Sequence, residues 1–257
     1  MNRNGITVKS CLRLLALGCA MTESKLLKSQ KRQIMREIYE NHMLLTAKRD
    51  RPEGWKLLSG LWSPFYIQLR ILSSFPSTLK KVGKAMSLML KEAAPHVNRL
   101  VGVAFAGVPI ATAVSIESGL PACHTRKFVG VTSQEDLQKA LAQYGQHSML
   151  EGDVQEGDVL CLVDDLVTQM DAKIMARTQV LSELERRGIK NVKCDDVAVL
   201  IDRQQGAAER AKTSGMRLFS LVKLVDEGLP MIKDLMSVDD YDQIRTYLAD
   251  PSKFQGR

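Results

Sequence analysis

The sequence predicts an α/β protein with a mainly parallel sheet that is covered by helices on both faces. Short apolar, β-branched runs alternate along the chain with segments whose apolar residues recur at helical spacing. The run Val159–Val163 is entirely apolar, which is typical of a strand buried on both faces. Gly119, Gly188 and Gly215 directly follow helical segments, where helices commonly end. Together these patterns predict repeated strand–helix–strand units.

The N-terminal third is expected to hold two helices and two short strands. Residues 23–46 form the first amphipathic helix, and residues 78–94 form the second. The expected strands are Lys56–Gly60 and Ser63–Arg70, around a glycine turn. The apolar stripe of the first helix consists of Leu26, Leu27, Ile34, Ile38 and Met43.

Strands and helices then alternate to the end of the chain. Strands are expected at 99–105, 121–126, 159–163, 197–201 and 218–222. Helices are expected at 109–118, 171–187, 206–214, 230–236 and 238–249. The connection between Arg126 and Val159 is long and has helical character only over 133–144. A connection of this length inside a compact domain usually forms a functional flap.

Composition indicates one globular domain that needs no metal or disulfide to stabilise it. The chain has 257 residues, of which 45% are hydrophobic and 25% are charged. Its five cysteines are widely spaced, which predicts reduced thiols in a reducing compartment, and hence a cytoplasmic protein. Four scattered histidines give no zinc-ligand spacing. No stretch is long and apolar enough to span a membrane, so no membrane partner is expected.

The net charge of +7 belongs entirely to the N-terminal segment. Residues 1–52 contain 11 Lys and Arg against 4 Asp and Glu, and the rest of the chain holds 25 of each. This segment could bind nucleic acid, or it could be a solvated basic helix packed on the domain by its apolar stripe. The second interpretation is favoured because no aromatic residues are interleaved with the basic ones. Residues 1–21 are expected to be a disordered extension, because Met21 is itself a plausible start.

The most informative segment is Val159–Thr168, an apolar strand followed by Asp164 and Asp165 and then by a helix. In open α/β sheets, ligands bind at the carboxyl ends of the strands. Adjacent carboxylates at such a position can accept hydrogen bonds from the vicinal hydroxyls of a sugar. The free N–H groups of the following helix can hold a phosphate. The segment therefore predicts a sugar-phosphate site.

Four segments in order resemble the orotate phosphoribosyltransferases, a family with the type I phosphoribosyltransferase fold that includes the transferase half of uridine monophosphate synthase. Leu160–Thr168 looks like the signature for 5-phosphoribosyl-1-pyrophosphate (PRPP). Ser59–Arg70 is similar to the pattern SGLxSPxYIDLR, and Gly102–Thr112 is similar to the pyrophosphate-loop segment. Val199–Gly206 matches VLIDREQG, and the pair Arg126-Lys127 also matches the family.

The resemblance implies a homodimeric enzyme that transfers the phosphoribosyl group of PRPP to orotate, with Mg²⁺ carried by PRPP and pyrophosphate as the second product. It implies one domain over residues 22–257, with a helix and hood strands over 22–75 and a flexible flap over 127–157. Arg126 and the catalytic Lys127 would contact the pyrophosphate, and Asp164 and Asp165 would take the ribose hydroxyls. The remaining implied substrate contacts are Thr168, Gln169, Met170, Asp171 and Ala172 for the 5′-phosphate, Arg203 for orotate, and Phe65 and Tyr66 for the base pocket.

Several positions differ from the family pattern. Met170 stands in place of a glycine, and Asp171 replaces a hydroxyl residue and could serve as the N-cap of the next helix. The flap lacks the usual lysine and histidine after Arg126-Lys127 and carries an insertion, with Lys139 and His147 as candidate substitutes. Leu58 and Gln68 replace a lysine and an aspartate. An alternative to the enzyme is therefore a catalytically impaired relative that acts as a PRPP- or nucleotide-binding regulator or partner subunit.

Overall fold

The structure is a computed structural model that describes residues 25–57, 60–128, 130, 133–143 and 148–254. The expected extension 1–21 lies outside the described residues, and so do Leu58 and His147. The α-helices are α2 (Lys25–Glu40), α3 (Ala47–Asp50), α4 (Pro76–Ala93), α5 (Gly107–Ser118), α6 (Gln134–Gln143), α7 (Asp171–Arg186), α8 (Ala207–Thr213), α9 (Leu229–Ile232) and α10 (Val238–Ala249). The strands are β1 (Leu44–Thr46), β2 (Trp55–Lys56), β3 (Trp62–Ser63), β4 (Phe65–Ile67), β5 (Arg99–Gly102), β6 (Ala122–Thr125), β7 (Leu150–Glu151), β8 (Val159–Val167), β9 (Lys193–Asp202) and β10 (Arg217–Lys223).

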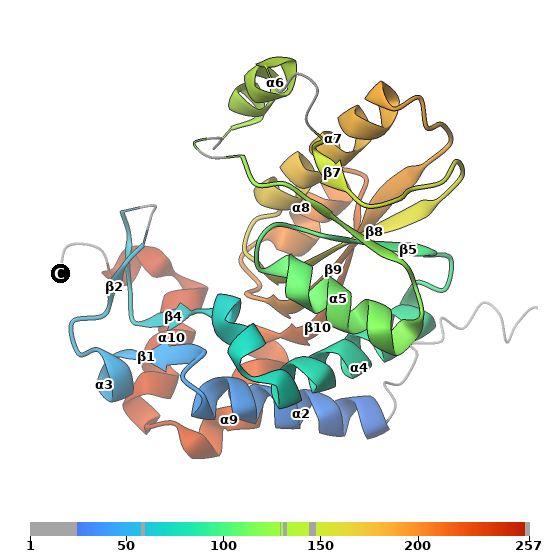
Figure 1. Cartoon of the computed structure of the whole chain (residues 1–257). Coiled ribbons are helices and arrows are strands. Elements are labelled where there is room, and N and C mark those ends of the chain that lie inside the picture. The colour runs from blue at the N-terminus through green and yellow to red at the C-terminus, as the bar shows by residue number, and fades with distance from the viewer. Residues whose placement is uncertain (1–24, 58–59, 129, 131–132, 144–147, 255–257) are drawn as a thin grey trace, which may run out of the picture.

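A mostly parallel sheet forms the centre of the molecule, as the alternating pattern predicts (Figure 1). Within the described part of the chain its strand order is β10-β9-β8-β5-β6-β7, and only β7 runs antiparallel to its neighbour. The first of these strands in the sequence, β5, lies in the interior of the sheet. The chain proceeds from β5 to β6 on one side and later returns to β8 on the other. The strand order therefore reverses between β5 and β8.

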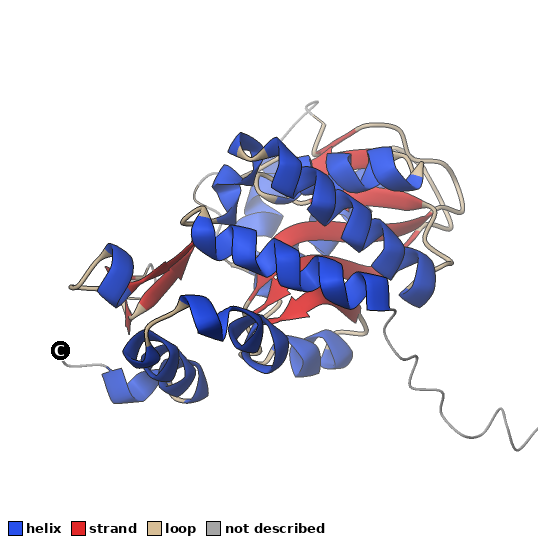
Figure 2. Cartoon of the chain, turned by 90° about the horizontal axis from the view of Figure 1, so that it is seen from below, coloured by secondary structure: helices blue, strands red, loops and turns tan. Residues whose placement is uncertain are grey.

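Apolar side chains of the sheet alternate between two cores, one on each face. Cys161 and Val163 pack with α2, α4 and α5, and Leu160 and Leu162 pack with α7 and α8. This alternation follows from the period of two residues along a strand. Figure 2 shows the sheet with helices on both sides. None of the helices in the described part of the chain combines the length and apolar character that a membrane crossing requires.

A small hood of short strands stands beside the main sheet (Figure 2). In it β1 pairs with β4 and β2 pairs with β3, both antiparallel. The C-terminal helix α10 closes the hood, because the buried carboxylate of Asp240 accepts hydrogen bonds from Thr46 Oγ1 at 2.8 Å and from the Lys48 backbone N–H at 3.0 Å. Residues from both ends of the described chain therefore build one unit.

The first helix is shorter than its apolar pattern predicts. It ends at Glu40, and Leu44–Thr46 forms a strand because these residues pair with Phe65–Ile67. The expected stripe is buried at Leu27, Ile34, Ile38 and Met43, whereas Leu26 is exposed. Basic residues of α2 pair with acidic ones, as Lys31 does with Glu227 at 3.2 Å and Arg36 with Asp234 at 2.7 Å. The helix thus packs on the domain in the manner of the favoured interpretation.

Strand β8 is longer than expected and runs through the acidic pair. The sequence predicts a strand that ends at Val163, but β8 continues to Val167 because it remains paired with β9 along that length. Its pairing with β5 ends at Val163 opposite Gly102. From Asp164 onward, β8 therefore has β9 as its neighbouring strand on one side only.

Candidate functional site

The loops after β5 and β8 meet at the point where the strand order reverses. Crevices at such points hold the ligands of open α/β sheets. The first residue of α5, Gly107, packs directly on β8. A Cβ atom at Gly107 would lie 2.1 Å from the Val163 carbonyl oxygen and 3.1 Å from the Asp164 Cα. Only glycine allows the two loops to approach this closely.

Asp164 is buried and paired with a lysine. Its Oδ2 accepts a hydrogen bond from Lys173 Nζ at 2.6 Å, and the same ammonium donates to the Leu166 carbonyl oxygen at 2.7 Å. Both side chains are almost inaccessible to solvent, with exposed fractions of 10% and 7%. Removing either partner would leave an uncompensated buried charge, which is strongly destabilising.

Asp165 differs from Asp164 although the two are adjacent. Its Oδ1 accepts a hydrogen bond from the Leu166 backbone N–H at 2.7 Å. Burial, followed by the negative charge of Asp164, raises the pKa of Asp165 to about 7, while the charge of Lys173 acts in the opposite direction. The Asp165 carboxyl group can therefore gain or lose a proton near neutral pH, and the Lys173 ammonium bonds Asp164 instead.

The loop after β8 keeps the backbone turn that a glycine would allow, although a methionine occupies the position. Met170 has φ of 71° and ψ of −17°, which is left-handed, and its side chain is buried in the core beneath α7. A non-glycine residue in this region carries a strain of about 1 kcal/mol. Burial of the side chain offsets that strain.

The N-cap prediction for Asp171 is wrong. Met170 occupies the N-cap position, and Asp171 is the first residue of α7. The Asp171 side chain is 59% exposed, and its Oδ1 lies 3.4 Å from Nη2 of Arg210 on α8. Because α8 offers this cation, the carboxylate forms an exposed ion pair and does not cap its own helix.

A hollow of about 330 Å³ lies at the start of α7. The first N–H groups of a helix have no acceptor within the helix, so such a position suits an anion. Thr168 is half-buried, whereas Gln169 and Ala172 are exposed. The hollow is lined by Leu166, Val167, Thr168, Gln169, Met170, Asp171, Ala172 and Lys173. All five predicted phosphate-loop residues therefore border one cavity.

Arg203 follows β9 and carries a half-buried guanidinium group whose Nε is fully buried. Its Nε is buried without a hydrogen-bond partner, and burial lowers the pKa of Arg203. The guanidinium carbon lies 4.9 Å from the centre of the Phe65 ring, a cation–π contact between the sheet and the hood. A guanidinium whose buried Nε has no hydrogen-bond partner among the described residues is suited to a planar anion such as a carboxylate.

The two predicted aromatic contacts lie on opposite faces of β4. Phe65 is buried against Arg203 and Tyr247. Tyr66 stacks with Trp55 at 6.3 Å between ring centres, and its hydroxyl oxygen accepts a hydrogen bond from Arg70 Nη2 at 2.9 Å. Consecutive strand residues point in opposite directions. Phe65 and Tyr66 therefore do not face the same pocket.

Arg126 and Lys127 lie beside the loop after β5. Both are exposed and border a cavity of about 780 Å³, together with Phe105 and His124. Lys127 Nζ lies 5.8 Å from the centre of the Phe105 ring, and Arg126 Nη1 lies 3.6 Å from Glu151 Oε1. The structure thus brings the predicted pyrophosphate cations to the predicted pyrophosphate loop.

Helix α7 connects the phosphate loop to both stems of the flap. The side-chain amide of Gln179 donates to the carbonyl oxygens of Arg126 and Met149, each at 2.8 Å. One turn later, the fully buried Glu183 accepts from Arg187 Nε at 2.7 Å. Arg187 in turn donates to the Leu150 carbonyl oxygen. These contacts fix the backbone of Arg126 against the helix that begins at the phosphate loop.

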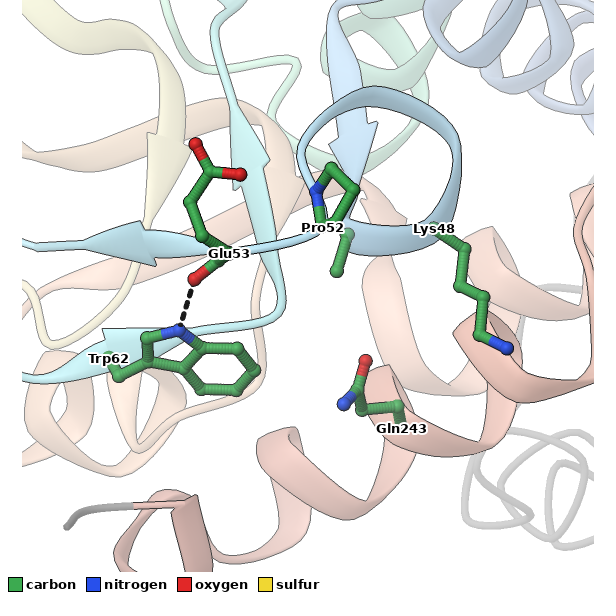
Figure 3. Close-up of a pocket in the computed structure, with 6 residues that line it drawn as sticks. Lys48, Pro52, Glu53, Trp62 and Gln243 are labelled. Carbon is green, nitrogen blue, oxygen red and sulfur yellow. Dashed lines mark hydrogen bonds between the residues drawn. The ribbon is translucent and has the colours of Figure 1, made fainter. Parts of the chain in front are cut away.

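A separate cavity of about 490 Å³ lies in the hood (Figure 3). Its wall includes the indole of Trp62, whose Nε1 donates to the Glu53 carbonyl oxygen at 2.7 Å. Lys48, Pro52 and Gln243 also border it. It contains neither the acidic pair nor the loops of the sheet, and we do not assign it to the site.

Lys173 is a site residue that the sequence prediction did not include, although its position on α7 carries a signal. Lys173 lies on the same stripe of α7 as Ala176, Val180 and Leu184, which are all buried. A lysine on the apolar stripe of a helix is expected to have a buried acidic partner. Asp164 lies on the neighbouring strand β8 and fills that role.

Known proteins provide an independent comparison. No protein-family model matches the sequence. The orotate phosphoribosyltransferase of Methanosarcina mazei is 32% identical over 170 residues, which cover 66% of this chain and 80% of the relative. That of Methanothermobacter thermautotrophicus is 30% identical over 196 residues, which cover 76% and 94%. The solved UMP synthase of Leishmania donovani has a TM-score of 0.69 at 22% identity, covering 87% of this chain and 43% of that one.

The structural likeness supports the type I phosphoribosyltransferase fold that the resemblance implies, with its mostly parallel sheet and flanking helices. The sequence relatives show the family as well as the fold, because one of them is 32% identical and is matched over 80% of its length. On these grounds the chain belongs to the orotate phosphoribosyltransferase family.

Proposed function

We propose that this protein is an orotate phosphoribosyltransferase, which joins orotate to PRPP and releases pyrophosphate in pyrimidine synthesis. The observation that carries the proposal is Arg203, whose buried Nε has no hydrogen-bond partner in the described structure. Such a group is costly unless a ligand satisfies it. The carboxylate of orotate would do so in a planar, bidentate manner.

In the proposed reaction a ring nitrogen of orotate forms a bond to C1 of the ribose while the bond from C1 to pyrophosphate breaks. Pyrophosphate leaves with the bonding electron pair, and the nitrogen loses its proton to water. Arg126 and Lys127 would stabilise the charge that develops on the leaving group. Asp165 would accept a hydrogen bond from the ribose, and the N–H groups of Thr168–Ala172 would hold the 5′-phosphate.

Mg²⁺ belongs to the proposal as a companion of PRPP. In the described part of the chain, no group of three or more His, Cys, Asp or Glu residues is placed to hold a metal ion. Mg²⁺ commonly binds through substrate phosphates and retains several waters. Bound to PRPP, it would neutralise part of the charge on the pyrophosphate.

The alternative, a catalytically impaired regulator, is less well supported. It rests on the changes at Met170 and Asp171, on those in the flap, and on Leu58 and Gln68, and the structure bears on the first two. Met170 adopts the left-handed turn, and Asp171 is directed to Arg210. The loop can therefore retain its shape and its capacity for an anion.

Acceptor choice tests the proposed function. Uracil lacks the carboxylate of orotate, so its use would leave Arg203 buried and unpaired. We expect transfer to orotate to exceed transfer to uracil on the order of 10⁴-fold in kcat/KM. Equal use of the two bases by the purified protein would contradict the proposed role of Arg203.

Substitution of Asp171 by serine is expected to change PRPP affinity by less than about fivefold. The exposed Asp171–Arg210 pair contributes at most about 1 kcal/mol to the free energy of folding, so its loss should disturb the loop little. Titration calorimetry of PRPP into the variant measures this affinity, and Arg210→Ser provides the matched control for loss of the pair. An affinity gain of 100-fold in Asp171→Ser would show that the carboxylate repels the phosphate after all.

Three further features complete the proposal. The family resemblance supports a homodimer in which the flap reaches the neighbouring site. The free, buried Cys123, Cys161 and Cys194 support a cytoplasmic location. The unit of function is one domain over residues 22–257, with the hood and flap as its appendages.

A further inference from the structure

Lys173 is a buried cation in the middle of the proposed ligand site. It lines the hollow at the start of α7, and its ammonium bonds both Asp164 and the Leu166 carbonyl oxygen. The two bonds join α7 to β8 on either side of Asp165. A lysine loses considerable side-chain entropy and hydration when it is buried, so its place in the site requires a specific partner.

The Lys173 ammonium bonds only one of the two adjacent carboxylates, that of Asp164. It lies 2.6 Å from Asp164 Oδ2. Asp164 Oδ1 is also engaged, because it accepts the Asp165 backbone N–H at 2.9 Å. Both oxygens of Asp164 are thus held by the protein. Asp165 Oδ1 accepts the Leu166 N–H, and the Asp165 carboxyl group also hydrogen-bonds the side chain of Asp164, but the lysine ammonium bonds Asp164.

We propose, on the basis of the proposed function, that Lys173 is a positioning residue that fixes Asp164 as a structural anion and leaves Asp165 as the carboxylate that takes the ribose hydroxyls of PRPP. The acidic pair then has two separate roles, set by a single ammonium. Asp164 and Lys173 form the rigid floor of the site, and Asp165 makes the ligand contact.

The charge balance of the site follows from this arrangement. Asp164 and Lys173 cancel each other, and Asp171 is matched by Arg210. The charged groups that act on Asp165 are Asp164 on its own strand and Lys173 on α7. Gly107 of α5, which packs on β8, has no side chain, and the adjacent end of β9 carries Asp202 and Arg203. The loop therefore presents little net negative charge to a phosphate.

The test uses Lys173→Met, which keeps most of the side-chain volume but removes the charge. Without the ammonium, Asp165 should retain its proton to higher pH, because one of the influences that lower its pKa is lost. The acid limb of the PRPP affinity profile should move up by about 1 to 3 pH units. We expect PRPP affinity at neutral pH to fall by about 100-fold.

The double variant Lys173→Met/Asp164→Asn is the matched control. It removes the ammonium together with the carboxylate that raises the pKa of Asp165, so the acid limb should return toward its wild-type position. It also avoids an unpaired buried charge, so it remains informative if the single variant fails to fold. PRPP titration calorimetry from pH 5.5 to 8.5 and ¹³C NMR titration of the aspartate carboxyl groups provide the readouts.

The outcomes separate this inference from the proposed function. The positioning role is supported if the acid limb of the PRPP affinity profile moves to higher pH in the single variant and returns in the double variant. This holds even if the wild-type protein shows no turnover. If both variants lose PRPP affinity equally at every pH and the acid limb does not move, Lys173 contributes only to packing and the inference is overturned. Unchanged PRPP affinity in the single variant would also overturn the inference. Wild-type turnover of orotate is a separate result that bears on the function alone.

Discussion

Replacement of Arg203 by methionine is expected to abolish efficient use of orotate without destabilising the protein. The guanidinium is half-buried, and its buried Nε has no hydrogen-bond partner in the described structure, so removal of the group relieves an unfavourable burial. Loss of one partner of a buried charge pair with the substrate costs about 3 kcal/mol, or roughly 100-fold in kcat/KM. We expect a melting temperature that is unchanged or higher. Orotate turnover and thermal unfolding of the same preparation measure both effects.

Arg245→Met provides the control for Arg203. Arg245 also lies over an aromatic ring, with its guanidinium carbon 5.7 Å from the centre of Tyr241, but it is exposed on α10. Its replacement should leave the KM for orotate as it is. If Arg203→Met unfolds at a much lower temperature than wild type, the residue supports the fold and the account of it as an unsatisfied ligand group is incorrect.

Replacement of Gly107 by alanine is expected to reduce both the stability of the protein and its affinity for PRPP. The new Cβ would lie 2.1 Å from the Val163 carbonyl oxygen, well inside any permitted contact. The start of α5 must then move away from β8, which is expected to reduce stability by about 1 to 3 kcal/mol. Because the loops after β5 and β8 separate, PRPP affinity should fall by about 100-fold. Urea unfolding and PRPP calorimetry measure the two effects.

Gly157→Ala is a suitable comparison for Gly107→Ala. Gly157 precedes β8 at the opposite end of the strand, has φ of 81°, and would place its Cβ with no atom within 4 Å. Its substitution should reduce stability by roughly 1 kcal/mol through backbone strain and leave PRPP affinity intact. Equal losses of PRPP affinity in the two variants would show that the contact at Gly107 does not position the site.

The sheet and its helices were predictable because they depend on local periodicity. Apolar runs such as Val159–Val163 lie in the strands expected, and α7 begins at Asp171 as predicted. The end of β8 was not predictable, since Asp164–Val167 extends the strand only through its pairing with β9. Similarly, Leu44–Thr46 forms a strand only because a distant segment pairs with it. Long-range pairing overrides local preference at both places.

The site was predicted in outline but not in its side-chain partners. The resemblance indicated Asp164, Asp165 and Arg203, and the structure brings the phosphate-loop residues to one hollow. The left-handed conformation of Met170 has no signature in a methionine. The contacts of Arg203 with Phe65 and of Lys173 with Asp164 join different elements of the fold. Partner choice of this kind depends on tertiary packing, which a single sequence does not encode in a readable pattern.

Direct measurement of turnover tests the central claim most sharply. The purified full-length protein is mixed with orotate, PRPP and Mg²⁺, the loss of orotate absorbance is followed, and orotidine 5′-monophosphate and pyrophosphate are quantified. We expect both products in equal amounts, at a rate that depends on all three components. No loss of orotate, together with no binding of PRPP in calorimetry, would contradict it.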